Sequence, residues 1–219
     1  MTPLQFITHT NERVSYTEGA QAALRGGCKW IQLRMKDASD TEFAETARQL
    51  LPHCRQLGGT LILDDRALLV REVGAQGVHL GKNDMPVAEA RKLLPKGEYI
   101  IGGTANTIED IRRLVAEGVD YIGCGPFRFT HTKSRLAPII GVDGYKKIID
   151  TMRRERIDIP LVAIGGITLA DIKTLRQVGV QAVAISGAIL QAGNPTAETR
   201  RFMAALDGNV NHQTAINND

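Results

Sequence analysis

The sequence is poor in cysteine and has no apolar run long enough to cross a membrane. Its three cysteines, Cys28, Cys54 and Cys124, are an odd number, and no two are spaced as a C-x-x-C pair. Neither a disulfide framework nor a zinc site is therefore predicted. A transmembrane helix needs about 18 consecutive apolar residues, which no segment approaches. We also expect no signal peptide, because the N-terminal segment lacks a long apolar core. A reducing cytoplasm is the expected location.

An excess of charge of one sign is also lacking. The chain has 27 basic and 24 acidic residues, a net charge of +3. No basic block is long enough for a nucleic-acid arm. The densest basic cluster, at 153–156, falls late in a helical pattern, where positive charge interacts favourably with the helix dipole. We therefore expect neither nucleic acid nor a membrane as a partner. The share of hydrophobic residues, 43%, is ordinary for a globular protein.

What is present is a regular alternation of short apolar segments with helical segments, repeated eight times. Such alternation predicts a parallel sheet, and eight units in about 200 residues suit a closed (β/α)8 TIM barrel. The alternative is an open doubly wound sheet, which usually carries G-x-G-x-x-G after its first strand; none is found there. We predict one catalytic barrel domain over residues 1–206 and a disordered polar tail over residues 207–219.

The expected strands are Leu4–Thr8, Lys29–Arg34, Thr60–Leu63, Gly77–Leu80, Tyr99–Gly102, Asp120–Cys124, Pro160–Ile164 and Gln181–Ile185. The expected helices are Thr17–Arg25, Asp40–Leu57, Ala67–Val73, Val87–Leu94, Thr107–Glu117, Val142–Arg156, Leu169–Val178 and Thr196–Leu206.

Acidic residues follow two successive predicted strands, where a barrel of this kind builds its active site. The third strand runs into Asp64 and Asp65, and the fourth leads to Asp84. Two converging carboxylates repel each other unless a cation lies between them, and Mg²⁺ is commonly held by one or two carboxylates plus substrate phosphates. The alternative is that Asp64 and Asp84 cap the helices that follow, and spacing alone slightly favours capping.

Polar and cationic residues follow the second and fifth strands. Alternation along the chain points Gln32, Arg34 and Lys36 the same way, and such a set can bind an anion with several oxygens. The alternative, a surface strand end with solvated charges, is weaker because an inward-pointing arginine in a barrel must find a partner. Thr104 fits a ligand contact and a helix cap equally well. His79 lies inside a strand and is predicted to be a core or supporting histidine rather than a catalyst.

The long connection over 125–141 carries two hydroxyls, an imidazole and an ammonium in four residues: Thr130, His131, Thr132 and Lys133. A loop this long is more often functional than inert, and we interpret it as a phosphate-gripping loop; His131 alone fits an acid, a base or neither. Glycines such as Gly166, and Ser186, follow the seventh and eighth strands, the usual phosphate site of phosphate-binding barrels. Ordinary turns are the alternative. The predicted enzyme joins two phosphorylated small molecules or isomerises one bisphosphate.

Taken together and in this order, the motifs resemble the thiamine phosphate synthase family from Phe6 to about Leu206. The motifs that carry the resemblance are Gln-Leu-Arg-x-Lys at 32–36, Asp65 before an arginine, Gly-Val-His-Leu-Gly at 77–81 with Asp84, Asp-Tyr-Ile-Gly at 120–123 leading to Gly-Pro at 125–126, Thr-x-Thr-Lys at 130–133 and Ala-Ile-Gly-Gly-Ile at 163–167. The resemblance implies a transferase that displaces diphosphate from hydroxymethylpyrimidine diphosphate with the ring nitrogen of a thiazole phosphate, through a pyrimidine carbocation.

The resemblance also implies a role for each site residue. Asp65 and Asp84 are expected to bind Mg²⁺, and Arg34, Lys36 and Lys133 are expected to act on the diphosphate. The implied substrate-binding residues are Gln32, Leu33, Arg34, Met35, Lys36, Asp64, Thr104, Thr130, His131, Thr132, Lys133, Gly166, Ile185 and Ser186. The partners are then small-molecule substrates, and the oligomeric state is left open, with a homodimer as one option.

Three positions depart from the family pattern: Asp64 replaces the usual Asn, Thr104 the usual Ser, and Phe129 a frequent Pro. The alternatives are a thiazole tautomerase of the same fold and a non-catalytic sensor of a phosphorylated ligand. A tautomerase needs a monophosphate pocket and an acid–base residue, but no metal or diphosphate grip. A sensor would not require paired metal carboxylates. The full set of charged strand ends therefore favours the synthase.

Overall fold

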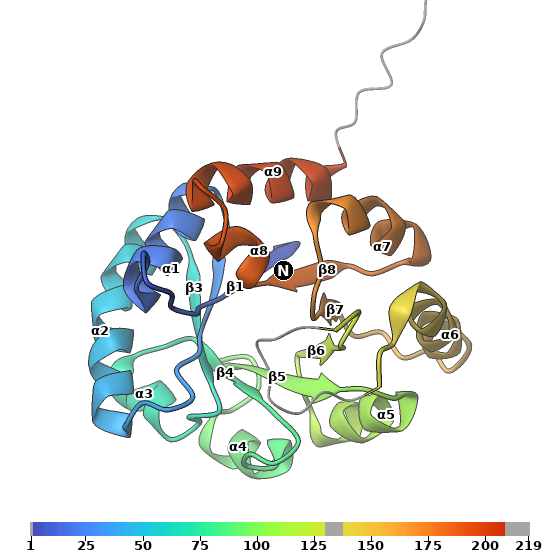
Figure 1. Ribbon diagram of the computed structural model, residues 1–219. Coiled ribbons are helices and arrows are strands. Elements are labelled where there is room, and N and C mark those ends of the chain that lie inside the picture. Colours follow the sequence, from blue (N-terminus) through green and yellow to red (C-terminus); the bar gives the residue numbers. More distant parts are fainter. Residues whose placement is uncertain (1, 130–137, 209–219) are drawn as a thin grey trace, which may run out of the picture.

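The computed structural model describes residues 2–129 and 138–208 and shows a closed barrel of eight parallel strands surrounded by helices (Figure 1). Each strand pairs with the next along the chain, and β8 closes the ring against β1. The predicted (β/α)8 barrel is confirmed. The strands are β1 (Leu4–Ile7), β2 (Trp30–Leu33), β3 (Thr60–Asp64), β4 (Gly77–Leu80), β5 (Ile100–Ala105), β6 (Tyr121–Cys124), β7 (Leu161–Ile164) and β8 (Ala182–Ile185).

The helices form the outer ring and bury one face each against the strands. They are α1 (Tyr16–Arg25), α2 (Asp40–Gln56), α3 (Leu69–Val73), α4 (Val87–Leu93), α5 (Ile108–Glu117), α6 (Gly141–Arg154), α7 (Ile172–Val178), α8 (Gly187–Leu190) and α9 (Pro195–Asp207), with a 3₁₀ turn, η1 (Leu169–Asp171), before α7. Within the described residues, no helix is long and apolar enough to span a membrane.

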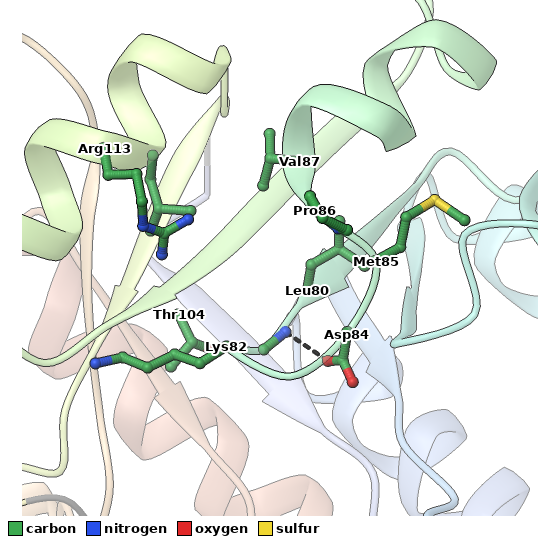
Figure 2. A pocket seen from close by; sticks show the side chains of 10 residues that line it. Leu80, Lys82, Asp84, Met85, Pro86, Val87, Thr104 and Arg113 are labelled. Carbon is green, nitrogen blue, oxygen red and sulfur yellow. Dashed lines mark hydrogen bonds between the residues drawn. The ribbon is translucent and has the colours of Figure 1, made fainter.

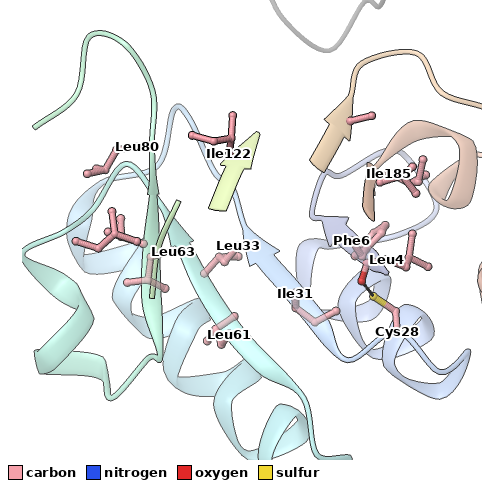
Figure 3. Packing of buried hydrophobic residues seen from close by; sticks show 14 of the residues in the cluster. Leu4, Phe6, Cys28, Ile31, Leu33, Leu61, Leu63, Leu80, Ile122 and Ile185 are labelled. Carbon is pink, nitrogen blue, oxygen red and sulfur yellow. Dashed lines mark hydrogen bonds between the residues drawn. The ribbon is translucent and has the colours of Figure 1, made fainter. Parts of the chain in front are cut away.

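Alternate strand residues fill two separate apolar clusters. The residues that face the helices, among them Phe6, Leu33 and Leu63, form the larger cluster with the inner faces of those helices (Figure 3). The intervening residues, among them Trp30 and Tyr121, form a smaller cluster inside the ring of strands. This alternation follows from the two-residue period of a strand, and it directs the remaining inward positions toward the mouth of the barrel.

The interior holds large polar rings because glycines stand beside them. A Cβ atom on Gly102 would lie 2.1 Å from the Tyr121 ring, and one on Gly123 would lie 2.7 Å from Cε1 of His79. Both distances are too short for non-bonded carbons, so the two rings occupy the space that side chains at these positions would fill. The glycines therefore decide where Tyr121 and His79 lie.

Gly102→Ala is expected to lower the free energy of unfolding by about 3 kcal/mol, because an overpacked core forces side chains from their rotamers. The matched control is Gly193→Ala, since a Cβ there meets nothing within 4 Å. Urea denaturation of both variants measures the difference. Equal stabilities would show that the barrel interior can shift to accept the methyl group.

Most predicted elements differ from the observed ones by one or two residues at an end, and two differ by more. β5 runs on to Ala105, so Thr104 is a strand residue and not part of the cap of α5, where Thr107 is the N-cap. The predicted helix over 169–178 is divided into η1 and α7. The short helix α8 was not predicted, because Gly187 directly after the strand indicated a turn.

Candidate active site

Asp65 and Asp84 meet at the carboxyl ends of β3 and β4. Asp64 ends β3, and Asp65 follows it with a φ of 66°, a left-handed conformation that is uncommon for a residue other than glycine. Asp84 accepts a hydrogen bond from the Gly81 amide at 2.6 Å (Figure 2), and its carboxyl group also hydrogen-bonds to that of Asp65. The expected convergence of the carboxylates therefore occurs.

The alternative role of these acids as helix caps is wrong. α3 begins at Leu69 and α4 follows Pro86, and neither helix has a side-chain cap. Asp64 instead lies within hydrogen-bonded strand, paired in register with His79 of β4. The acids at these strand ends are consequently available for other chemistry.

Three cations surround the acids. Arg34 Nε lies 3.4 Å and Lys36 Nζ 3.5 Å from Asp64 Oδ2. Lys36 also contacts Asp65, and Arg66 Nη1 lies 3.9 Å from Asp65 Oδ2. Strand alternation brings Arg34 and Lys36 to the mouth of the barrel, as the sequence predicted. Asp64 neutralises part of this positive charge.

Burial and the shared contact separate the acidities of the two carboxyl groups. Burial, followed by the hydrogen bond and charge of Asp65, raises the pKa of Asp84 to about 6. Burial also opposes ionisation of Asp65, but its hydrogen bonds with Asp84 and Lys36 outweigh that effect and lower its pKa. Below about pH 6, Asp65 is thus the anion and Asp84 holds the proton that they share, and at higher pH the two carboxylates repel each other. A divalent cation would take the place of that proton.

The shared proton predicts a pH dependence of stability in the metal-free protein. Because the pKa of Asp84 is about 6 in the folded state and 3.8 without perturbation, the folded state binds more protons between these values. The resulting stabilisation is complete below pH 3.8 and is lost as the pH rises through about 6. Urea denaturation from about pH 4 to about pH 7 measures how the free energy of unfolding changes with pH. This free energy should decline less steeply in Asp84→Asn than in the parent. Equal slopes in the two proteins would contradict a shared proton.

A chain of polar side chains lies below the acids inside the barrel. His79 joins the hydroxyl of Tyr121, at 3.0 Å from Nδ1, to that of Thr104, at 2.9 Å from Nε2. The prediction that His79 is a core or supporting histidine is confirmed. Gln32 is 2% exposed, and its amide nitrogen has no hydrogen bond of ordinary length among the described residues, although its side chain also interacts with the Tyr121 hydroxyl. A buried donor left without a partner is costly, which marks a place for a ligand acceptor.

Thr104 and Asp84 line one pocket, as Figure 2 shows. The pocket lies between the ends of β4 and β5, α4 and α5, and Lys82 and Arg113 also line it. Lys82 Nζ lies 2.6 Å from Asp110 Oδ2, and Arg113 Nη1 lies 2.9 Å from Glu117 Oε1. Thr104 therefore opens onto the same space as one of the predicted metal ligands.

The glycines after β7 are held in place by an arginine that sequence reasoning missed. Gly166 has a φ of 67°, and its carbonyl accepts a hydrogen bond from Arg128 Nη1 at 3.0 Å. Arg128 also forms a two-pronged pair with Asp171, at 2.6 and 2.7 Å. The partners lie 43 residues apart, and no local pattern indicates such a contact. The segment after β7, which carries Gly166, is thus fixed to the segment after β6 by the salt bridge between Asp171 and Arg128.

Other predicted contacts divide into three groups. The side chains of Leu33, Met35 and Ile185 are buried in the cluster that faces the helices, so contact with a ligand in the barrel would involve their backbone. Ser186 is the N-cap residue of α8, next to β8. The predicted contacts at Thr130, His131, Thr132 and Lys133 lie outside the described residues.

The chemistry of the site fits a magnesium ion better than a protein-only metal cage. Within the ranges that the structure describes, no three His, Cys, Asp or Glu side chains cluster as metal ligands. Asp65 and Asp84 form a pair of oxygen donors, and cations stand ready for phosphate oxygens. Mg²⁺ commonly takes one or two carboxylates, with substrate phosphates and water completing its octahedron.

Comparison with known proteins decides the family. The family model described as thiamine monophosphate synthase matches residues 4–189. The chain belongs to the thiamine monophosphate synthase family. It is 53% identical over 200 residues to the thiamine-phosphate synthase of Phocaeicola vulgatus, covering 91% of this chain and 96% of the relative. It is also 53% identical over 203 residues to that of Bacteroides fragilis, covering 93% and 99%.

Solved structures agree with this assignment. The thiamine phosphate pyrophosphorylase of Pyrococcus furiosus superposes with a TM-score of 0.83 at 30% identity, covering 93% of this chain and 95% of that one. A 3-hexulose-6-phosphate synthase superposes with a TM-score of 0.70 at 16% identity, covering 94% and 100%, a likeness that shows the fold alone. The predicted family and the predicted enzyme class, a transferase of thiamine biosynthesis, are confirmed by the family model and the two relatives.

Proposed function

We propose that this member of the thiamine monophosphate synthase family condenses 4-amino-2-methyl-5-(diphosphooxymethyl)pyrimidine with 4-methyl-5-(2-phosphoethyl)thiazole, or its carboxylate, to give thiamine phosphate and diphosphate. The observation that carries the proposal is the Asp65–Asp84 pair beside Arg34 and Lys36. Paired oxygen donors next to two cations would suit a diphosphate and its metal ion. The thiamine-phosphate synthases to which the chain is similar support the same reaction.

The proposed step is a dissociative displacement. The bond between the pyrimidine methylene carbon and the diphosphate oxygen breaks, and the electron pair leaves with diphosphate. The thiazole ring nitrogen then donates its lone pair to the methylene cation, so no covalent enzyme intermediate is required. Arg34 and Lys36 would stabilise charge that develops on the leaving group, an effect that exceeds binding of the intact substrate.

Asp65 and Asp84 would hold Mg²⁺, which supplies further positive charge to the departing diphosphate. In the absence of metal, these two carboxyl groups share a proton below about pH 6, and Lys36 contacts Asp65. Binding of a magnesium diphosphate would replace the proton and draw Lys36 toward phosphate oxygens. The charges needed for the leaving group are therefore already gathered at the mouth of the barrel.

The two ring substrates fit different parts of the barrel. The unpartnered amide nitrogen of Gln32 would donate to a pyrimidine ring nitrogen in the interior. Backbone groups at Gly166, together with Ser186, would bind the monophosphate of the thiazole at the ends of β7 and β8. Asp64, held by Arg34 and Lys36, would orient the two cations rather than bind metal.

The tautomerase and sensor alternatives leave the carboxylate pair without a role.

Cytoplasmic action is also part of the proposal, because all three cysteines are free and buried in the structure, as suits a reducing compartment. The expected substrate contacts of Thr130, His131, Thr132 and Lys133 stay predictions, and the oligomeric state stays open, with a homodimer as one option.

The test is an assay of the purified chain with both substrates, in Mg²⁺ and in excess chelator. We expect thiamine phosphate and diphosphate in equal amounts, with formation abolished by the chelator and restored by added Mg²⁺. A second arm supplies the thiazole carboxylate tautomer alone. Isomerisation there without condensation in the first arm would establish the tautomerase instead, and inactivity in both arms would overturn an enzymatic role.

A further inference from the structure

A hydrogen-bonded chain crosses the barrel interior and ends at Thr104. Gln5 Nε2 lies 3.3 Å from the Tyr121 hydroxyl, which lies 3.0 Å from His79 Nδ1, and His79 Nε2 lies 2.9 Å from Thr104 Oγ1. The four residues come from β1, β6, β4 and β5. Gln5, Tyr121 and His79 are buried, and Thr104 is partly exposed and lines the pocket that Asp84 also lines.

The chemistry of the partners gives this chain a direction. Burial raises the pKa of Tyr121 well above its ordinary value, so the phenol keeps its proton. The Gln5 amide nitrogen is a donor and cannot accept that proton. The Gln32 side chain lowers the pKa of Tyr121, as a donor to the phenol oxygen does. Imidazole Nδ1 can accept the phenol proton. Tyr121 therefore donates to Nδ1, and a neutral imidazole with Nδ1 unprotonated carries its own proton on Nε2. That N–H donates to the oxygen of Thr104.

The direction fixes what Thr104 offers to a ligand. Because its oxygen accepts from His79, the hydroxyl proton of Thr104 points away from the imidazole and is available to an acceptor in the pocket. The oxygens of a diphosphate are such acceptors. In the other tautomer of His79, Nε2 is an acceptor, and the Thr104 hydroxyl would donate its proton to it. Thr104 would then present only oxygen lone pairs to the ligand, which an anion repels.

The position of the imidazole is fixed by packing. Its ring lies 5.5 Å from that of Tyr121 between centroids, with 32° between the planes, and Tyr121 meets Trp30 edge-on at 4.8 Å. A Cβ atom on Gly123 would lie 2.7 Å from His79 Cε1. The ring thus fills a slot that the neighbouring strand leaves open, and rotation would break both of its hydrogen bonds.

We infer that His79 is a positioning residue that, with Tyr121, directs the Thr104 hydroxyl proton toward the diphosphate of the pyrimidine substrate. The inference rests on the proposed function for the identity of that substrate. It does not assign His79 a contact with the reacting atoms. The Tyr121 phenol selects the tautomer of the His79 imidazole. That tautomer in turn decides whether the Thr104 hydroxyl donates its proton to the ligand.

Two substitutions separate this role from simple packing. His79→Gln places an amide N–H₂ near the position of Nε2, so it can still donate to Thr104. His79→Asn places a carbonyl near Nδ1 for Tyr121 but is too short to reach Thr104. Thr104→Val removes the hydroxyl, and His53→Asn on α2 is the matched control at a histidine outside the barrel interior.

We expect His79→Asn and Thr104→Val each to raise KM for the pyrimidine diphosphate about tenfold, the size of one hydrogen bond to a charged group. KM for the thiazole phosphate should stay unchanged, and His79→Gln should stay within about threefold of the parent. The double variant His79→Asn/Thr104→Val should be no worse than Thr104→Val, because both changes remove the same interaction. The control should match the parent.

Calorimetric binding of inorganic diphosphate with Mg²⁺ gives a readout that needs no turnover. The same order of variants is expected there, so a parent that binds diphosphate with this order but forms no product would sink the proposed reaction and leave the inference standing. Equal losses in His79→Asn and His79→Gln, or additive losses in the double variant, would overturn the inference and leave a packing role.

Discussion

Asp84→Ala is expected to lower the rate of product formation at least about 100-fold, because a carboxylate that binds the metal at a leaving group acts mainly in the transition state. Asp84 also accepts the Gly81 amide, and loss of one such bond costs only about 1 kcal/mol. The relief of repulsion from Asp65 offsets that cost. The protein should therefore remain folded while it loses activity, as turnover assays and thermal denaturation would measure.

Two further variants make the result specific to the metal site. Asp84→Asn keeps an acceptor for Gly81 and should lose activity as severely, whereas Asp150→Asn, on the exposed face of α6 and paired with Lys146, should not. Raising the Mg²⁺ concentration should restore part of the activity of Asp84→Asn but none of that of a denatured protein. Unchanged turnover in Asp84→Ala would remove the metal from this position.

Arg34→Met should lower kcat/KM for the pyrimidine diphosphate about 100-fold, because the guanidinium is preorganised beside the place where negative charge develops. Arg34→Lys should recover only part of the loss, since a lysine lacks the planar fork that matches phosphate oxygens. Steady-state kinetics with each substrate varied in turn measures the effect, and KM for the thiazole phosphate should change little.

The control for Arg34 is Arg48→Met on α2, which breaks an exposed pair with Glu72 of α3. Folding of Arg34→Met should be retained, because Lys36 remains 3.5 Å from Asp64. If Arg34→Met unfolds while Arg48→Met does not, the Arg34–Asp64 pair is structural. If Arg34→Met is folded and fully active, the leaving group binds elsewhere.

The fold and much of the site could be predicted because both depend on local patterns. The two-residue period of strands sorted Gln32, Arg34 and Lys36 from Leu33 and Met35, and the structure separates them in the same way. The carboxyl ends of parallel strands converge in any closed barrel, so acids that follow β3 and β4 had to approach each other. These inferences needed no knowledge of distant contacts.

Features that depend on distant partners could not be predicted. The bidentate pair between Arg128 and Asp171 forms across two strand ends. Asp64 contacts Arg34 whereas Asp65 meets Asp84, and this difference depends on the left-handed conformation of Asp65. The end of β5 was misplaced, because the predicted strand stops at Gly102 and the observed one runs on to Ala105. Gly102 admits the ring of Tyr121 from the neighbouring strand, a role that no local pattern indicates.

The pairing of β1 with β8 has a consequence for biosynthesis of the chain. Leu4 lies opposite Val183, and α9 packs beside α1, where Thr196 bonds to the carbonyl of Ala22 at 3.1 Å. Until β8 leaves the ribosome, one edge of β1 has no native partner and stays open to mispairing with other chains. The ring can close only after β8 has been synthesised, so ordering of the barrel mouth should follow the formation of the other strand pairs.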